Sequence, residues 1–192
     1  MTKEELAEQL SLSMDRDIPE EDIPSLELYM DQILTLVDRE LGETRREEGE
    51  KLLTKTMVNN YTKEGLLKRI KGKTYSREHI RMLLLVYQMK QALPLQDLKR
   101  FLGGMEDLLA DSSGNYHPQG TKELYRDYLA IKERERRRLS QMLQDLLWTG
   151  EEGDEEVSPR QAVMALAGLS VLCKRAAQRL IDDYYGPKDE KK

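Results

Sequence analysis

The side chains best suited to chemistry in this sequence are cations and amides gathered between residues 51 and 100. That segment holds 12 Lys and Arg residues against 3 Asp and Glu residues, whereas residues 1–50 hold 5 against 16. Clustered lysine and arginine neutralise phosphates and release counterions, which is typical of nucleic-acid-binding surfaces. An ordinary solvated surface with uneven charge is the alternative, so the interpretation depends on the elements that position these residues.

A short helix is predicted over residues 55–63, with Thr54 as its N-cap and Gly65 as the left-handed residue beyond its end. Met57, Val58 and Tyr61 fall on one side of this helix. The other side carries mostly Lys55, Thr56, Asn59, Asn60 and Lys63. Because asparagine can pair bidentately with adenine in the major groove, we expect Asn59 or Asn60 to read bases.

The stretch LLKRIKGKTY at residues 66–75 is short, basic and centred on Gly72, which suits a two-stranded loop. Ser76 is then expected to cap a longer helix. A polar-faced helix, a basic ribbon and an apolar helix follow one another in this order in a winged helix-turn-helix. The cations of the ribbon suit phosphates better than bases, because flexible cations position a protein without specifying sequence. The predicted DNA contacts outside the short helix are Lys68, Arg69, Lys71, Lys73 and Arg77.

The flanking segments predict the rest of the motif. A helix from Ser25 to about Leu41 is expected to be the first helix of the helix-turn-helix, joined to the second by an inserted loop, GETRREEGEKL. The helix from Ser76 to Leu93 is apolar almost all round, which predicts a central position in its domain. Pro94 suits the first turn of a further helix that ends near Leu102.

Two family resemblances follow from these residues. The head resembles that of MerR-type regulators through Tyr61, Glu64-Gly65-Leu66-Leu67, Tyr75-Ser76, Glu78, Leu95-Gln96-Asp97-Leu98 and Leu102. This resemblance implies a recognition helix, a wing and two packing helices. The chain differs in having Asn59-Asn60-Tyr61 where those helices usually present Arg-Tyr-Tyr. Most of the chain also resembles a bacterial family, domain-of-unknown-function family 1836, through residues 28–34, 53–67 and 74–80.

The predicted fold is mainly α, with a MerR-like winged helix-turn-helix head, a small β wing and a C-terminal helical hairpin. We expect an acidic N-terminal helix and linker at 1–24, the DNA-binding head at 25–110 and a linker at 111–120. A helical dimerisation or effector region at 121–185 and a disordered tail at 186–192 follow. Cys173 is expected on the packing side of the last helix, and the charged run KERERRRL is expected to be solvated or paired between helices.

Catalytic chemistry is not expected. Gly72-Lys73-Thr74 lacks the glycine that a phosphate-binding loop needs five residues earlier. His79 and His117 suit solvated positions, and one cysteine cannot build a structural zinc site. The acidic run at 151–156 lacks calcium-loop spacing. We therefore predict no enzyme, no metal and no cofactor.

The predicted function is that of a sequence-specific transcriptional regulator that binds double-stranded DNA as a homodimer. The alternative is a helical protein-interaction adaptor whose basic face binds an acidic partner, or the chain's own acidic N-terminal half. An RNA-binding accessory protein is a third possibility, against which the scarcity of aromatics in the basic segment argues. The lone cysteine, the absence of an apolar leader and the absence of a long apolar run predict a cytoplasmic location without a membrane.

Overall fold

The computed structural model describes residues 16–146 and 158–186. This part of the chain is mainly helical with a small two-stranded sheet, which confirms the expected helical class. It divides into two compact units, a larger one of residues 16–129 and 177–186 and a smaller one of residues 130–146 and 158–176. The helix expected near the N-terminus, the acidic run at 151–156 and most of the expected tail lie outside the described residues.

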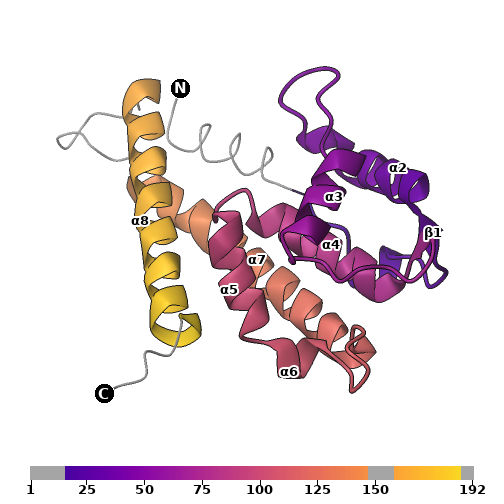
Figure 1. The fold of residues 1–192 in the computed structure, drawn as a ribbon. Helices are drawn as coiled ribbons and strands as arrows, with labels where there is room; N and C mark the ends of the chain where they lie inside the picture. Colours follow the sequence, from indigo (N-terminus) through magenta and orange to yellow (C-terminus); the bar gives the residue numbers. More distant parts are fainter. Residues whose placement is uncertain (1–15, 147–157, 187–192) are drawn as a thin grey trace, which may run out of the picture. The chain divides into compact units, whose positions relative to one another are not determined.

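The described elements are short helical turns, two short strands and longer helices (Figure 1). They are η1 (Glu20–Asp22), β1 (Leu28–Tyr29), α2 (Met30–Leu41), η2 (Gly42–Thr44), α3 (Lys55–Lys63), β2 (Thr74–Tyr75), α4 (Arg77–Met89), α5 (Leu95–Gly103), α6 (Glu106–Leu109), α7 (Pro118–Leu146) and α8 (Pro159–Tyr185). The larger unit contains every element up to α6, the first part of α7 and the end of α8.

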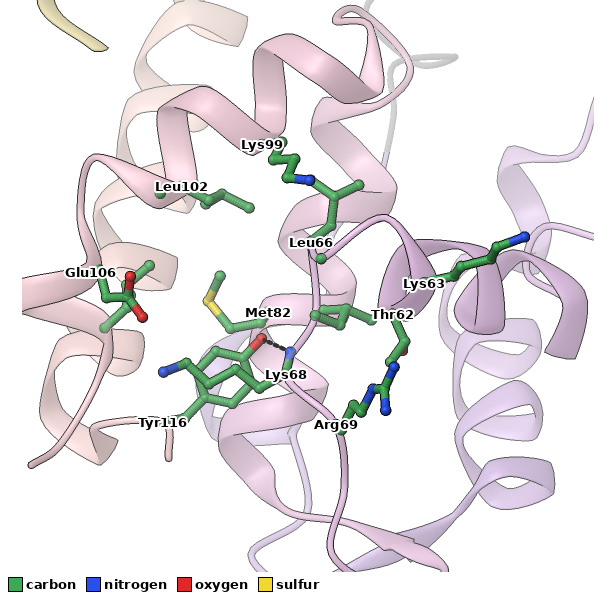
Figure 2. Close-up of a pocket in the computed structure, with 14 residues that line it drawn as sticks. Thr62, Lys63, Leu66, Lys68, Arg69, Met82, Lys99, Leu102, Glu106 and Tyr116 are labelled. Carbon is green, nitrogen blue, oxygen red and sulfur yellow. Dashed lines mark hydrogen bonds between the residues drawn. The ribbon is translucent and has the colours of Figure 1, made fainter. Parts of the chain in front are cut away.

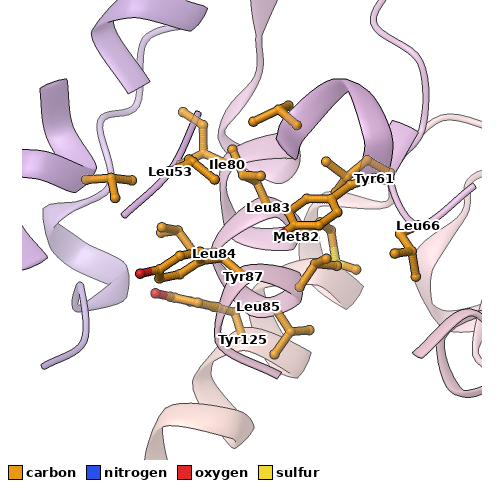
Figure 3. Packing of buried hydrophobic residues seen from close by; sticks show 14 of the residues in the cluster. Leu53, Tyr61, Leu66, Ile80, Met82, Leu83, Leu84, Leu85, Tyr87 and Tyr125 are labelled. Carbon is orange, nitrogen blue, oxygen red and sulfur yellow. The ribbon is translucent and has the colours of Figure 1, made fainter. Parts of the chain in front are cut away.

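Helix α4 forms the centre of the larger unit, as its apolar sequence predicts. Every residue from Ile80 to Gln88 is buried, and the same buried cluster includes Leu53 and Tyr61 from the region of α3 and Tyr125 from α7 (Figure 3). The helix ends at Met89 rather than at Leu93. A burial of this extent fixes α4 and makes it the support for the elements that carry the basic residues.

The expected helix from Ser25 begins instead at Met30, because residues 28–29 form a strand. Leu28 pairs with Tyr75, and Tyr29 pairs with Thr74, in antiparallel register. Leu26, just before this strand, is 76% exposed. The two-stranded loop expected within residues 66–75 was also wrong: only β2 within it is a strand, and its partner precedes α2.

Two segments expected to be linkers are packed into the larger unit. In the acidic stretch before α2, Ile18 and Ile23 are each 1% exposed, and the Ile18 carbonyl accepts a hydrogen bond from the Tyr125 hydroxyl at 2.7 Å. The segment after α6 forms a bridge between Ala110 and Tyr116, and Tyr116 is buried. Apolar residues inside these polar sequences bring both segments onto the core.

In the smaller unit, the charges of the KERERRRL run pair mainly along α7. Glu133 accepts from Arg137 at 2.9 Å and Glu135 from Arg138 at 3.1 Å, at the three- and four-residue spacings that bring helical side chains together. Helix α8 exposes Val163, and Cys173, which was expected on the packing side, is also exposed. No helix in the described part of the chain is both long enough and apolar enough to cross a membrane.

Candidate nucleic-acid interface

Helix α3 forms where its local signals predict it. The Thr54 side chain accepts a hydrogen bond from the Met57 amide at 3.2 Å, which satisfies a free donor of the first turn. Gly65, just beyond the C-cap, has a φ of 79°, a conformation that glycine adopts without strain. Val58 and Tyr61 are buried against the core. These contacts fix which face of the helix meets solvent.

The solvent face of α3 carries the five residues predicted to contact DNA. Lys55, Thr56, Asn59, Asn60 and Lys63 are all exposed. Within the part of the chain that the structure describes, no side-chain hydrogen bond or ion pair engages the last four. Lys55 Nζ lies 2.7 Å from Asp31 Oδ1 on α2, but both groups are exposed, so the pair contributes little stability.

The basic segment between α3 and β2 divides into free and anchored cations. Arg69, Lys71 and Lys73 are exposed, and their side chains have no partner among the described residues. Lys68 is anchored: its amide donates to the Tyr116 hydroxyl at 2.9 Å, and its Nζ donates to the Gly114 carbonyl at 2.8 Å. Lys68 therefore joins this segment to the loop before α7 and is less available to a ligand.

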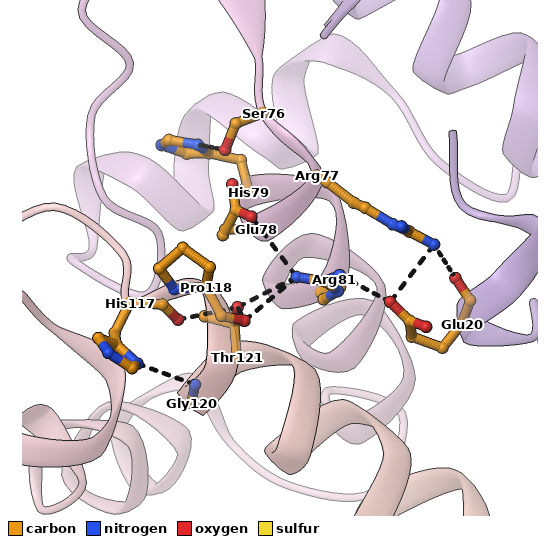
Figure 4. A network of polar contacts seen from close by, with 10 residues as sticks. All are labelled: Glu20, Ser76, Arg77, Glu78, His79, Arg81, His117, Pro118, Gly120 and Thr121. Carbon is orange, nitrogen blue, oxygen red and sulfur yellow. Dashed lines mark hydrogen bonds and ion pairs between the residues drawn. The ribbon is translucent and has the colours of Figure 1, made fainter. Parts of the chain in front are cut away.

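Arg77 is the predicted contact that a buried carboxylate holds. Its Nη2 donates to the Glu20 carbonyl at 2.7 Å and lies 3.4 Å from Glu20 Oε1 (Figure 4). Arg81 Nη2 reaches the same Oε1 at 2.6 Å, and both Glu20 and Arg81 are buried. Burial alone would raise the pKa of Glu20, but the hydrogen bond from Arg81 and the charges of both arginines lower it below 4.5.

His79, expected at the surface, lies against two aromatic rings behind the basic segment. Its ring centroid is 4.9 Å from that of Tyr116 and 6.1 Å from that of Tyr75, both edge-on. Its Nδ1 is 2.9 Å from the Ser76 hydroxyl (Figure 4). Burial lowers the pKa of His79, and burial raises the pKa of Tyr116 to about 12. The edge-on contact between the two rings gives both side chains a packing role.

Sequence reasoning missed Tyr116 and Lys99, which approach the basic segment from distant parts of the chain. Together with residues 62–69 and α5, they line a pocket of about 520 Å³ (Figure 2). An aromatic residue in the polar stretch DSSGNYHPQG was the available signal for Tyr116. Lys99 carries no local signal, because its position depends on the packing of α5.

Two further sequence features can be placed. Thr74 of the Gly72-Lys73-Thr74 sequence belongs to β2, and the exposed His117 accepts a hydrogen bond from the Gly120 amide at 3.1 Å at the start of α7. In residues 16–146 and 158–186, no three His, Cys, Asp or Glu side chains gather as metal ligands would.

The larger unit is thus a mainly helical domain, built around α4, with a two-residue strand pair and a basic surface segment. A family model described as "Domain of unknown function (DUF1836)" matches residues 18–128, more than half of the chain. The chain belongs to this family, as residues 28–34, 53–67 and 74–80 predicted. No curated protein and no solved structure matches the chain.

Proposed function

We propose that the protein is a sequence-specific, DNA-binding transcriptional regulator with a MerR-like winged helix-turn-helix head. The observation that supports this proposal is the division of α3 into two faces. Val58 and Tyr61 hold the helix to the core, while Asn59, Asn60 and Lys63 face solvent without internal partners. A helix fixed on one side, with free amides and cations on the other, suits entry into the major groove.

The antiparallel pairing of β1 with β2 supports the proposal that the basic segment forms a wing. β1 leads directly into α2, and β2 follows the basic segment. Pairing between the two strands ties the end of that segment to the start of α2, the first helix of the proposed motif. The loop between α2 and α3, which includes η2, is longer than the usual turn, and we propose that it is an insertion in the motif.

The proposed contacts have different roles. Asn59 and Asn60 read base edges, because their amides can donate and accept in the plane of a base. Lys63, Arg69 and the free lysines of residues 71–73 bind phosphates and fix the position of the head. Lys68 acts mainly through its backbone and loop contacts, and Arg77 acts as an internal support.

We propose a homodimer with a second copy of this chain covering the apolar face of α8. Met164 and Val171 lie seven residues apart on this helix and are 68% and 49% exposed, and the neighbouring Leu172 is 65% exposed. Ala167 and Gly168 between them allow close approach of another helix. A symmetric pair would present two heads to half-sites about 34 Å apart.

Fluorescence anisotropy with a labelled random duplex tests the central proposal. We expect binding at low salt that weakens steeply as salt rises, followed by enrichment of a defined sequence in repeated selection. A duplex that remains unbound at low salt, or a binding constant that is independent of salt, would refute it.

The adaptor alternative also has a specific observation in its favour, the exposed apolar face of α8. An adaptor and a regulator differ in what the basic face binds. Competition of duplex DNA with an acidic polypeptide such as polyglutamate discriminates between them. The regulator should retain duplex in excess polyglutamate, whereas the adaptor should release it.

A further inference from the structure

We infer that the larger unit binds a small organic anion with an apolar body, in the pocket behind the C-terminal end of α3. The pocket measures about 520 Å³, within the range of about 300–1,000 Å³ usual for small-molecule sites. All its lining residues belong to the larger unit. The pocket shares Lys63, Lys68 and Arg69 with the predicted DNA contacts but excludes Asn59 and Asn60, and the inference does not depend on DNA binding.

The floor of the pocket is apolar. Leu66 and Leu67 enter from the turn after α3, Met82 from α4, and Leu102 from α5. Each of these side chains is at most 8% exposed, so the floor is preformed by the core. Figure 2 shows Leu66, Met82 and Leu102 around the hollow. A ligand with an alkyl or aryl body would bury its apolar surface here.

The polar groups around this floor favour an anion. Lys63, Lys68, Arg69 and Lys99 line the pocket, against the single carboxylate of Glu106, and the Nζ of Lys68 is already bonded to the Gly114 carbonyl. Figure 2 shows Lys99 and Lys68 flanking the hollow, whereas Lys63 points away from it. The side chains of Lys99 and Glu106 have no partner within the described residues, so both are available to a ligand.

The positions of these charges also orient the ligand. Lys99 extends over the turn at Gly65, where its Cε lies 3.7 Å from the Cβ that an alanine would have. Glu106 repels an anionic head on its own side of the hollow (Figure 2). The head group, a carboxylate or a phosphate, therefore lies toward Lys99, and the apolar body lies over Met82 and Leu102.

Methyl NMR of the full chain with labelled methionine tests this site, with Met82 assigned through Met82→Leu. The probes are octanoate, octyl phosphate and neutral 1-octanol. We expect a saturable shift of the Met82 methyl with at least one anion, which also identifies the preferred head, and weaker binding of octanol. Unchanged Met82 signals with both anions, or equal affinity for octanol, would overturn the inference.

Two surface substitutions with opposite effects test the charge argument without disturbing the core. Lys99→Gln should weaken binding of the anion about fivefold, since one exposed charge contributes up to about 1 kcal/mol, and leave octanol unchanged. Glu106→Gln should strengthen binding of the anion. Lys90→Gln, at an exposed lysine outside the pocket, is the matched control. Equal effects of Lys99→Gln and Lys90→Gln would overturn the assignment of the head group.

Discussion

Removal of the free cations after α3 should change the salt dependence of DNA binding by a predictable amount. Four candidate phosphate contacts have no internal side-chain partner within the described residues: Lys63, Arg69, Lys71 and Lys73. Each neutralised phosphate contributes about −0.9 to the slope of log K against log salt, so one head should give about −3.6. The double variant Lys71→Ala with Lys73→Ala retains two contacts and should give about −1.8.

These slopes translate into separable affinities. Between about 50 and about 200 mM salt, the unaltered head should lose about 150-fold in affinity, and the double variant about 12-fold. Anisotropy titrations of one duplex over that range measure both slopes. A dimer that engages two heads doubles each slope and leaves their ratio at about two.

A charge-matched control separates local contact from loss of net charge. Lys90→Ala with Arg126→Ala also removes two exposed cations, at sites outside α3, the basic segment and the proposed dimer face of α8. We expect the slope of this control to match that of the unaltered protein. The assignment of these contacts would be refuted if the control reduced the slope as much as the double variant does. It would also be refuted if the double variant kept the full slope.

Three further predictions test other parts of the molecule. Asn59→Ala or Asn60→Ala should cost about 1–3 kcal/mol at particular base pairs, measured by sequence selection; unchanged preference in both would remove them from readout. Leu172→Lys should make the protein monomeric in light scattering; a dimer that persists would exclude the apolar face of α8. Glu20→Gln should lower the free energy of unfolding at neutral pH by less than the roughly 3–5 kcal/mol of a fully unpaired buried charge, because the buried Arg81 loses Glu20 at 2.6 Å but keeps Glu78 at 3.5 Å. Because folding lowers the pKa of Glu20 below 4.5, the unaltered protein should keep this contribution above pH 4.5 and lose it as pH falls through the lowered pKa. Denaturant titrations of both proteins at pH 7 and pH 3 measure it. A difference in free energy of unfolding that is the same at both pH values would contradict this prediction.

The sequence predicted the elements whose signals are local. Thr54, Gly65 and the spacing of Val58 and Tyr61 determine α3 and its exposed face within about ten residues, so its bounds agree with the structure. The apolar composition of α4 likewise indicates its central position. In both cases short-range capping and periodicity agree with the tertiary packing.

The parts that sequence reasoning missed depend on contacts between distant residues. Leu28 and Tyr29 have a helical spacing of apolar neighbours, and only their pairing with residues 74–75 makes them a strand. The pocket likewise needs Lys99 and Tyr116 beside the turn after α3. No local sequence pattern specifies that these residues lie close together, because their proximity depends on how α5 and the loop before α7 pack on the core.

Between residues 16 and 50, the carboxylates of Glu20 and Asp31 are held by cations of the same unit. Glu20 is buried beneath α4, and Asp31 pairs with Lys55 on α3. Residues 16–50 are packed or paired at several points with the unit that carries the basic face, so their charge is held in fixed positions. The electrostatic potential around α3 therefore depends on which cations these carboxylates neutralise. Carboxylates engage Lys55 and Arg77, and a backbone carbonyl engages Lys68. Lys63, Arg69, Lys71 and Lys73 have no side-chain partner among the described residues, so phosphate binding should come from the C-terminal end of α3 and the segment after it.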